Sequence, residues 1–74
     1  KKLTWELETV YQPEEQQRHY HENENRTWFI QEEEKDRWSV YESTGNFHIL
    51  YHYTFGSLED AKEYCEYQQS KIEE

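Results

Sequence analysis

The chain has 74 residues, only 32 % of them hydrophobic, and a net charge of −9 from 17 Asp and Glu against 8 Lys and Arg. A chain this short forms at most one domain, so we expect residues 1–74 to fold as a single unit with a small core. The negative charge argues against direct contact with nucleic acid or anionic membranes and favours a basic partner. No apolar run reaches the roughly 18 residues that span a bilayer.

Aromatic residues offset the low hydrophobic content. They make up 18 % of the chain, including 3 Trp and 7 Tyr, and each one buries a large area. We therefore expect a folded domain with a thin aromatic core, and a homodimer that adds buried area. Cys65 is the one cysteine and cannot form an internal disulfide. With no signal peptide evident, the expected location is the cytoplasm.

The N-terminal segment KLTWELETVY predicts a strand, because Leu3, Trp5 and Leu7 alternate with polar residues. The alternation slips before Val10, which is typical of a bulge, and Pro13 ends the strand. The polar stretch that follows, PEEQQRHYHENEN, fits a short helix, a second hairpin arm or a loop.

The segment RTWFIQEE predicts a strand over residues 27–33, with Trp28 and Ile30 on the core face. A three-residue loop of residues 34–36 would pair Ile30 with Val40 and Trp28 with Glu42 in the next strand. A two-residue loop would instead turn Phe29 inward. We prefer the first because it buries a Trp and an Ile.

The segments RWSVYES and FHILYHY flank Thr44 and Gly45, which predicts a hairpin closed by these two residues. In that register Val40 faces Ile49. The predicted core face carries Trp38, Val40, Phe47, Ile49 and Tyr51. The predicted opposite face carries Ser39, Tyr41, His48, Leu50 and His52.

The C-terminal segment predicts a helix from about 58 to 72. Gly56 breaks the preceding structure, and Ser57 with Asp60 resembles a capping box. An apolar stripe recurs at helical spacing through Leu58, Ala61, Cys65 and Ile72. The expected fold class is α+β: a three- or four-stranded antiparallel meander with one C-terminal amphipathic helix packed on one face.

Catalytic and metal chemistry find little support. His48 and His52 are four apart on an expected strand, roughly 13 Å from each other, so they cannot share an ion. His19 and His21 are closer, but no compact ligand repeat accompanies them. Cys65 lies on the apolar stripe, as a buried structural thiol would. We expect no enzyme activity, no cofactor and no metal.

Two acidic groups are candidate partner-binding surfaces. The first is the turn Glu32, Glu33, Glu34 and Asp36, and the second is the helix row Glu59, Glu63 and Glu66. Helical steps of three and four residues span roughly 4.5 to 6 Å. Successive phosphates of a nucleic-acid strand lie about 6 to 7 Å apart. The row can therefore imitate a phosphate backbone, although a solvated helix face has the same pattern. The aromatic face with Phe29, Tyr41 and Leu50 is a candidate dimer or partner surface.

In size, in its charge of −9 and in stretches such as QEEEKD and LEDAKEYCE, the chain resembles a class of small acidic phage proteins. Members of that class inhibit host DNA-binding proteins, such as a sliding clamp or the histone-like protein HU, by imitating DNA. The resemblance implies a basic DNA-binding protein of a bacterial host as partner, a dimer, no catalysis and the cytoplasm of an infected cell. It assigns no individual residues, because surface charge alone defines the class.

The leading hypothesis is therefore a non-enzymatic DNA mimic. The alternative is a small structural or adaptor module that binds a protein partner through the aromatic face, with acid only as solubilising surface. A third hypothesis, a metal-dependent regulator, rests on the four histidines alone.

Overall fold

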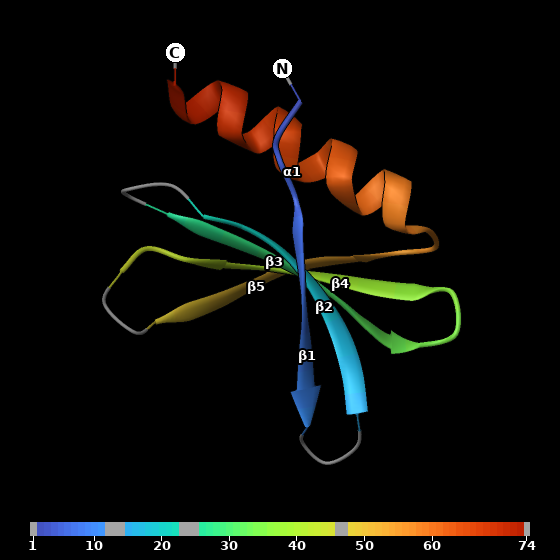
Figure 1. Cartoon of the computed structure of the whole chain (residues 1–74). Coiled ribbons are helices and arrows are strands. Elements are labelled where there is room, and N and C mark those ends of the chain that lie inside the picture. Colours follow the sequence, from blue (N-terminus) through green and yellow to red (C-terminus); the bar gives the residue numbers. More distant parts are fainter. Residues whose placement is uncertain (1, 12–14, 23–25, 46–47, 74) are drawn as a thin grey trace.

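The computed structural model describes residues 2–11, 15–22, 26–45 and 48–73. The protein is α+β, with a five-stranded antiparallel meander followed by one C-terminal helix that packs on the sheet (Figure 1). The elements are β1 (Glu6–Tyr11), β2 (Glu15–Glu22), β3 (Thr27–Glu34), β4 (Arg37–Ser43), β5 (Ile49–Phe55) and α1 (Leu58–Glu73). The strands lie side by side in chain order, so β1 and β5 form the two edges.

The prediction of three or four strands is wrong because the polar stretch after β1 forms a fifth strand, β2. Of the three alternatives for that stretch, the second hairpin arm is confirmed, although Pro13 itself lies outside the described residues. Polar cross-strand contacts on one sheet face support β2 in place of apolar burial: Arg18 pairs with Glu8 on β1, and Gln31 on β3 donates to Gln16. Such a strand lacks the alternation that identifies strands in a sequence.

The N-terminal strand begins later than predicted. Residues 2–5 leave the sheet and cross α1 (Figure 1), and Leu3 and Trp5 pack against the core from that position. The backbone N–H of Leu3 donates to Glu66 Oε2 at 3.2 Å, which ties this segment to the helix. The predicted bulge before Val10 is absent, because β1 pairs with β2 without a shift from Glu6 to Tyr11.

The register between β3 and β4 is confirmed: Ile30 lies opposite Val40, and Trp28 lies opposite Glu42. The turn differs from the predicted three-residue loop. Glu34 pairs with Arg37, and a bulge between Glu32 and Glu34 takes up the extra residue. Asp36 adopts a φ of 62°, a left-handed conformation that Asp tolerates in tight turns.

The predicted register between β4 and β5 is wrong. Ile49 lies opposite Ser43 rather than Val40, and Tyr51 lies opposite Tyr41 rather than Trp38. The connection is longer than Thr44-Gly45, and the offset of three positions turns the β5 side chains before the next bulge, such as Ile49 and Tyr51, to the other face. Ile49 is therefore 59 % exposed instead of belonging to the core. Phe47, predicted on the core face, lies outside the described residues.

A second bulge follows in this strand pair, between Ser39 and Tyr41. Both His52 and Tyr53 then stand opposite Val40, and both contact Tyr64 of α1. The helix face of β5 thus carries a histidine and a tyrosine where the sequence pattern predicts only one inward residue.

The core lies between α1 and the last three strands. Its fully buried hydrophobic residues are Trp28, Ile30, Val40, Ala61 and Cys65. Helix α1 contacts β3, β4 and β5, and in the described residues it makes no comparable contact with β1 or β2. Asp60 N donates to Ser57 Oγ at 3.2 Å, which confirms the predicted N-cap. The stripe ends early, because Ile72 is exposed.

Candidate functional site

The two predicted acidic groups lie at the same end of the sheet. Trp38, just after the β3–β4 turn, pairs with Phe55, just before α1, so the turn and the first helical turn are neighbours (Figure 1). The side chains that this end exposes are Glu32, Glu33, Glu34, Asp36, Glu59, Asp60 and Glu63. We call this region the acidic end. Its two parts are at least 23 positions apart in the sequence, from Asp36 to Glu59, and come together only through the fold.

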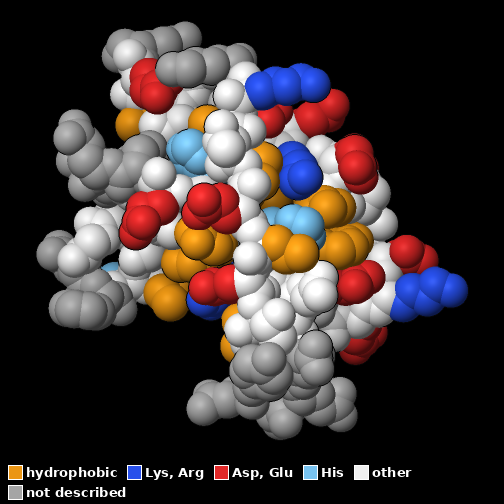
Figure 2. Space-filling view, viewed as in Figure 1, with side chains coloured by type: hydrophobic (Ala, Val, Ile, Leu, Met, Phe, Trp, Pro, Cys, Tyr) orange, Lys and Arg blue, Asp and Glu red, His pale blue; other side chains and the backbone are white. Residues whose placement is uncertain are grey.

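The acidic end is not an unbroken negative surface. Lys35 and Arg37 stand within the turn, and Figure 2 shows acidic side chains in separate groups with basic ones between them. The side chain of Glu33 lies on the sheet face away from α1, where its carboxylate accepts a hydrogen bond from the Tyr41 hydroxyl at 2.5 Å. Of the predicted turn group, Glu32, Glu34 and Asp36 make no such contact.

The three glutamates of the predicted helix row differ in their contacts: Glu66 accepts a hydrogen bond within the fold, whereas Glu59 and Glu63 are exposed. Glu59, Glu63 and Glu66 line a hollow of about 330 Å³ between α1 and the N-terminal segment, together with Lys2 and Lys62. Glu66 is half-buried and accepts the Leu3 N–H, so it holds the chain together more than it faces a partner. Glu59 and Glu63 remain exposed. Lys62, which lies off the row in the sequence pattern, joins the same hollow.

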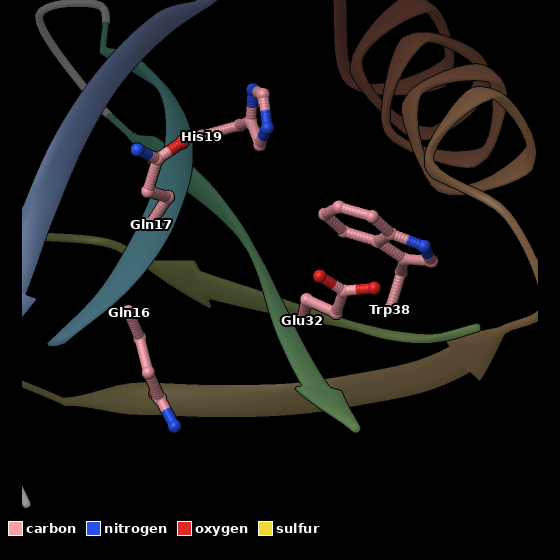
Figure 3. Close-up of a pocket in the computed structure, with 5 residues that line it drawn as sticks. All are labelled: Gln16, Gln17, His19, Glu32 and Trp38. Atoms are coloured by element: carbon pink, nitrogen blue, oxygen red, sulfur yellow. The ribbon is translucent and has the colours of Figure 1, made fainter. Parts of the chain in front are cut away.

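A second hollow opens beside the acidic end, on the helix side of the sheet. We call it the Trp38 pocket. It has a volume of about 290 Å³, and Gln16, Gln17, His19, Glu32 and Trp38 line it (Figure 3). The rings of His19 and Trp38 meet edge to face, 5.9 Å apart. Sequence reasoning placed Glu32 in the acidic turn and missed this pocket, because β2 was not assigned.

The charge of His19 is set by its surroundings. Burial lowers the pKa of its imidazole, and the positive charge of Lys62 lowers it further, while Glu59 acts in the opposite direction. His19 is therefore neutral at pH 7, since its ordinary value is already 6.5.

No helix or strand of the described residues covers the sheet face away from α1, which carries aromatic residues; we call it the open face. Phe29 and Tyr41 are cross-strand partners, as the sequence placed them, and Tyr41 meets Tyr51 at 5.7 Å. Leu50 is not part of this group: it lies opposite Glu42 on the helix side, and Ile49 takes its place. The predicted set of Phe29, Tyr41 and Leu50 is corrected accordingly.

The open face also contains a cation. The guanidinium of Arg18 lies 4.5 Å from the centre of the Phe29 ring and pairs with Glu8. The groove beside it has a volume of about 130 Å³ and is lined by Arg18, Phe29, Gln31, Tyr41 and Ile49. The face is thus apolar in its middle, and Arg18 stands beside it among the carboxylates of Glu8 and Glu33.

A hydrogen-bonded network inside the protein was also missed. Glu42, only 8 % exposed, approaches His52 Nε2 at 2.7 Å and Arg26 Nε at 2.5 Å. His52 Nδ1 meets the Tyr64 hydroxyl at 2.7 Å, so the network joins β4, β5 and α1. Because a carboxylate only accepts, Nε2 donates to Glu42, and in a neutral ring Nδ1 accepts from Tyr64. The sequence did contain a signal for this network: the predicted register places Glu42 opposite Trp28, on the buried face of the sheet.

Cys65 lies in the core, and burial raises the pKa of its thiol to about 12. This agrees with the predicted structural role and removes it as a nucleophile at neutral pH. In the described ranges, no three His, Cys, Asp or Glu side chains are placed to hold a metal ion. No helix in this part of the chain is long and apolar enough to cross a membrane.

Comparison with known proteins gives no relative: no protein-family model, no curated protein and no solved structure matches the chain. Function therefore has to be argued from the residues and their arrangement.

Proposed function

We propose that this protein is a non-enzymatic inhibitor that imitates DNA and occupies the DNA-binding surface or channel of a basic protein of a bacterial host. The observation that carries the proposal is the pairing of Trp38 with Phe55, which joins two acidic segments into one exposed end. Besides Glu33, which is bonded to Tyr41, that end presents six carboxylates against three basic side chains, Lys35, Arg37 and Lys62. A protein that grips phosphates with Lys and Arg would meet comparable charge there.

Dimerisation belongs to the same proposal. The open face offers an apolar centre, and Arg18 beside it is paired with Glu8, so two copies can bury aromatic surface there although each carries a net charge of −9. Face-to-face packing of two sheets would bury Phe29, Tyr41, Ile49 and Tyr51. It would leave both acidic ends free.

The test uses charge-changing variants. One variant carries Glu32→Lys and Glu34→Lys, and a second carries Glu59→Lys and Glu63→Lys. A control carries Thr9→Lys and Glu22→Lys on exposed positions of β1 and β2, outside the acidic end, and these also make the net charge less negative. Glu33 and Glu66 are left intact because each accepts a hydrogen bond within the fold.

Each variant is immobilised, and proteins captured from a bacterial lysate are challenged with duplex DNA at two salt concentrations. DNA should displace a captured DNA-binding protein from the parent, and capture should weaken steeply between about 50 and 200 mM salt. The acidic-end variants should lose capture, and the control should retain it. Equal capture by all three would contradict mimicry and leave the acid as solubilising surface.

The open face favours a second candidate function, an adaptor module. Tyr51 and Ile49 are each more than half exposed, and aromatic residues are enriched at protein interfaces. An adaptor would bind its partner through this face, with little dependence on salt. Loss of capture on Ile49→Asp, together with indifference to duplex DNA, would support it over mimicry.

A further inference from the structure

The Trp38 pocket is lined by polar side chains and one aromatic ring. In Figure 3, Gln17, His19, Glu32 and Trp38 surround the open space, and the indole nitrogen of Trp38 points away from it. Gln16 also points away and accepts a hydrogen bond from Gln31 on the other sheet face. The pocket therefore offers mainly acceptors next to an aromatic ring: a carboxylate, an amide oxygen and one nitrogen of a neutral imidazole. Its donors are the amide hydrogens of Gln17 and the remaining imidazole N–H.

The charge of the pocket selects a cation. Glu32 supplies an exposed carboxylate, and His19 contributes no positive charge there because its pKa is lowered by burial and by Lys62. Glu59 and Lys62 both act on His19 from α1 with opposite signs. Glu32 is left as the uncompensated charge in the lining, so an anion is disfavoured.

An arginine side chain fits this lining better than a lysine. The guanidinium is planar, carries five N–H donors and is weakly hydrated, so it can stack on an indole while it donates to a carboxylate. A lysine ammonium is a compact, strongly hydrated charge with three donors and gains less from a flat ring. A volume of about 290 Å³ is enough for one guanidinium and part of its aliphatic stem.

We infer that the Trp38 pocket binds an arginine side chain of the protein partner, with the guanidinium stacked on Trp38 and hydrogen-bonded to Glu32. The inference rests on the proposed function, because DNA-binding surfaces contact phosphates and base edges through arginine. Glu32 would then replace a phosphate and Trp38 a base. The pocket adjoins the acidic end, so an arginine held there would fix how the partner sits on the surrounding carboxylates.

The probe is Nα-acetyl-arginine methylamide, compared with its lysine and citrulline counterparts. Citrulline keeps the shape of arginine without its charge. Binding is followed by two-dimensional NMR through the three Trp indole N–H signals; Trp38→Phe identifies the Trp38 signal by its loss. The arginine compound should shift that signal in a saturable way. The citrulline compound should bind about tenfold more weakly, as expected for loss of a charge-assisted hydrogen bond.

Two variants supply the matched control. Glu32→Gln should weaken binding of the arginine compound about tenfold. Glu22→Gln removes the same charge from an exposed position at the end of β2, outside the pocket and the acidic end, and should change binding less than about twofold. The dispersion of the amide spectrum shows whether each variant folds.

The NMR experiment tests the arginine pocket independently of the lysate experiment, which tests the proposed function. No shift of the Trp38 signal, equal binding of arginine and citrulline compounds, or equal effects of the two variants would overturn the pocket, whatever the lysate experiment shows. Selective arginine binding that depends on Glu32 supports the pocket. If captured proteins are nevertheless indifferent to duplex DNA, mimicry fails and the arginine site stands.

Discussion

The indole Nε1 of Trp28 donates a hydrogen bond to Oε1 of Gln69 at 2.9 Å, across 41 positions of sequence. Trp28 is fully buried on β3 and Gln69 is buried on α1, so the bond joins sheet to helix inside the core. A helix this polar has few apolar side chains to hold it, and a directed hydrogen bond fixes its position along the sheet.

Replacement of Gln69 by Leu should destabilise the protein by about 1 to 3 kcal/mol, because it leaves the buried indole N–H without an acceptor. Chemical denaturation followed by Trp fluorescence measures the change. Gln68→Leu is the control, since Gln68 is the half-buried neighbour and should shift the free energy of unfolding by less than about 0.5 kcal/mol. A similar loss in both variants would contradict the role of Gln69.

Glu42→Gln tests the internal network. Glu42 accepts from His52 and pairs with Arg26, so its neutralisation breaks an ion pair between two poorly solvated side chains. Breaking such a pair should cost about 3 kcal/mol. Thermal unfolding of Glu42→Gln should therefore occur well below that of Glu34→Gln, which removes an exposed charge. Equal melting temperatures would show that the network contributes nothing.

Cys65 should resist thiol reagents in the folded protein. Its thiol is fully buried, with a pKa of about 12, so both access and thiolate are lacking at pH 8. Colour release from a disulfide reagent should follow the unfolding rate and become fast in denaturant. Immediate reaction of native protein would refute the burial.

Stability should fall in alkali. The pKa of Cys65 is raised from 9.0 to about 12 by burial, and that of Tyr41 from 10.0 to about 12 by burial and by its bond to Glu33. Below pH 9 both groups are protonated in both states, so their contribution is constant. Above pH 9 the unfolded chain releases protons that the folded chain retains, and stability is lost up to about pH 12. Denaturation at several pH values should show a shallower decline in Cys65→Ala, and an unchanged slope would contradict this account.

Ile49→Asp should convert the proposed dimer to a monomer. The residue is 59 % exposed on the open face, and a carboxylate there would have to be desolvated when two copies meet. Light scattering should give twice 9.3 kDa for the parent and 9.3 kDa for the variant. Leu7→Asp is the control, because Leu7 is 54 % exposed on the helix-facing side of β1. A monomeric parent at micromolar concentrations would remove the dimer from the proposal.

Sequence reasoning succeeded where the pattern was local. The helix, its Ser57 cap and the Ile30–Val40 register all follow from residues close in the chain. Cys65 was placed correctly because helical spacing sets it on the buried stripe.

It failed where polar contacts or irregular backbone decide the structure. Strand β2 is held by pairs such as Arg18 with Glu8, which no hydrophobic alternation reveals. Neither the longer β4–β5 connection nor the bulge opposite Val40 can be read from composition. The longer connection exchanged the faces of Ile49 and Leu50. The acidic residues of the candidate site could be identified from the sequence. Their position at one end of the sheet beside Trp38 could not, because it depends on the fold.

The strand order also determines whether further molecules can add to the edges of the sheet. One free edge is β1, with Glu6 and Glu8, and the other is β5, whose sequence ILYHYTF has no Asp, Glu, Lys or Arg. Unlimited edge-to-edge growth would need β1 of one molecule to pair with β5 of the next. The charged carboxylates on β1 disfavour that strand pairing. Pairing of β5 with β5 uses the same edge twice and ends after two molecules. The uneven edges therefore direct the chain away from fibres.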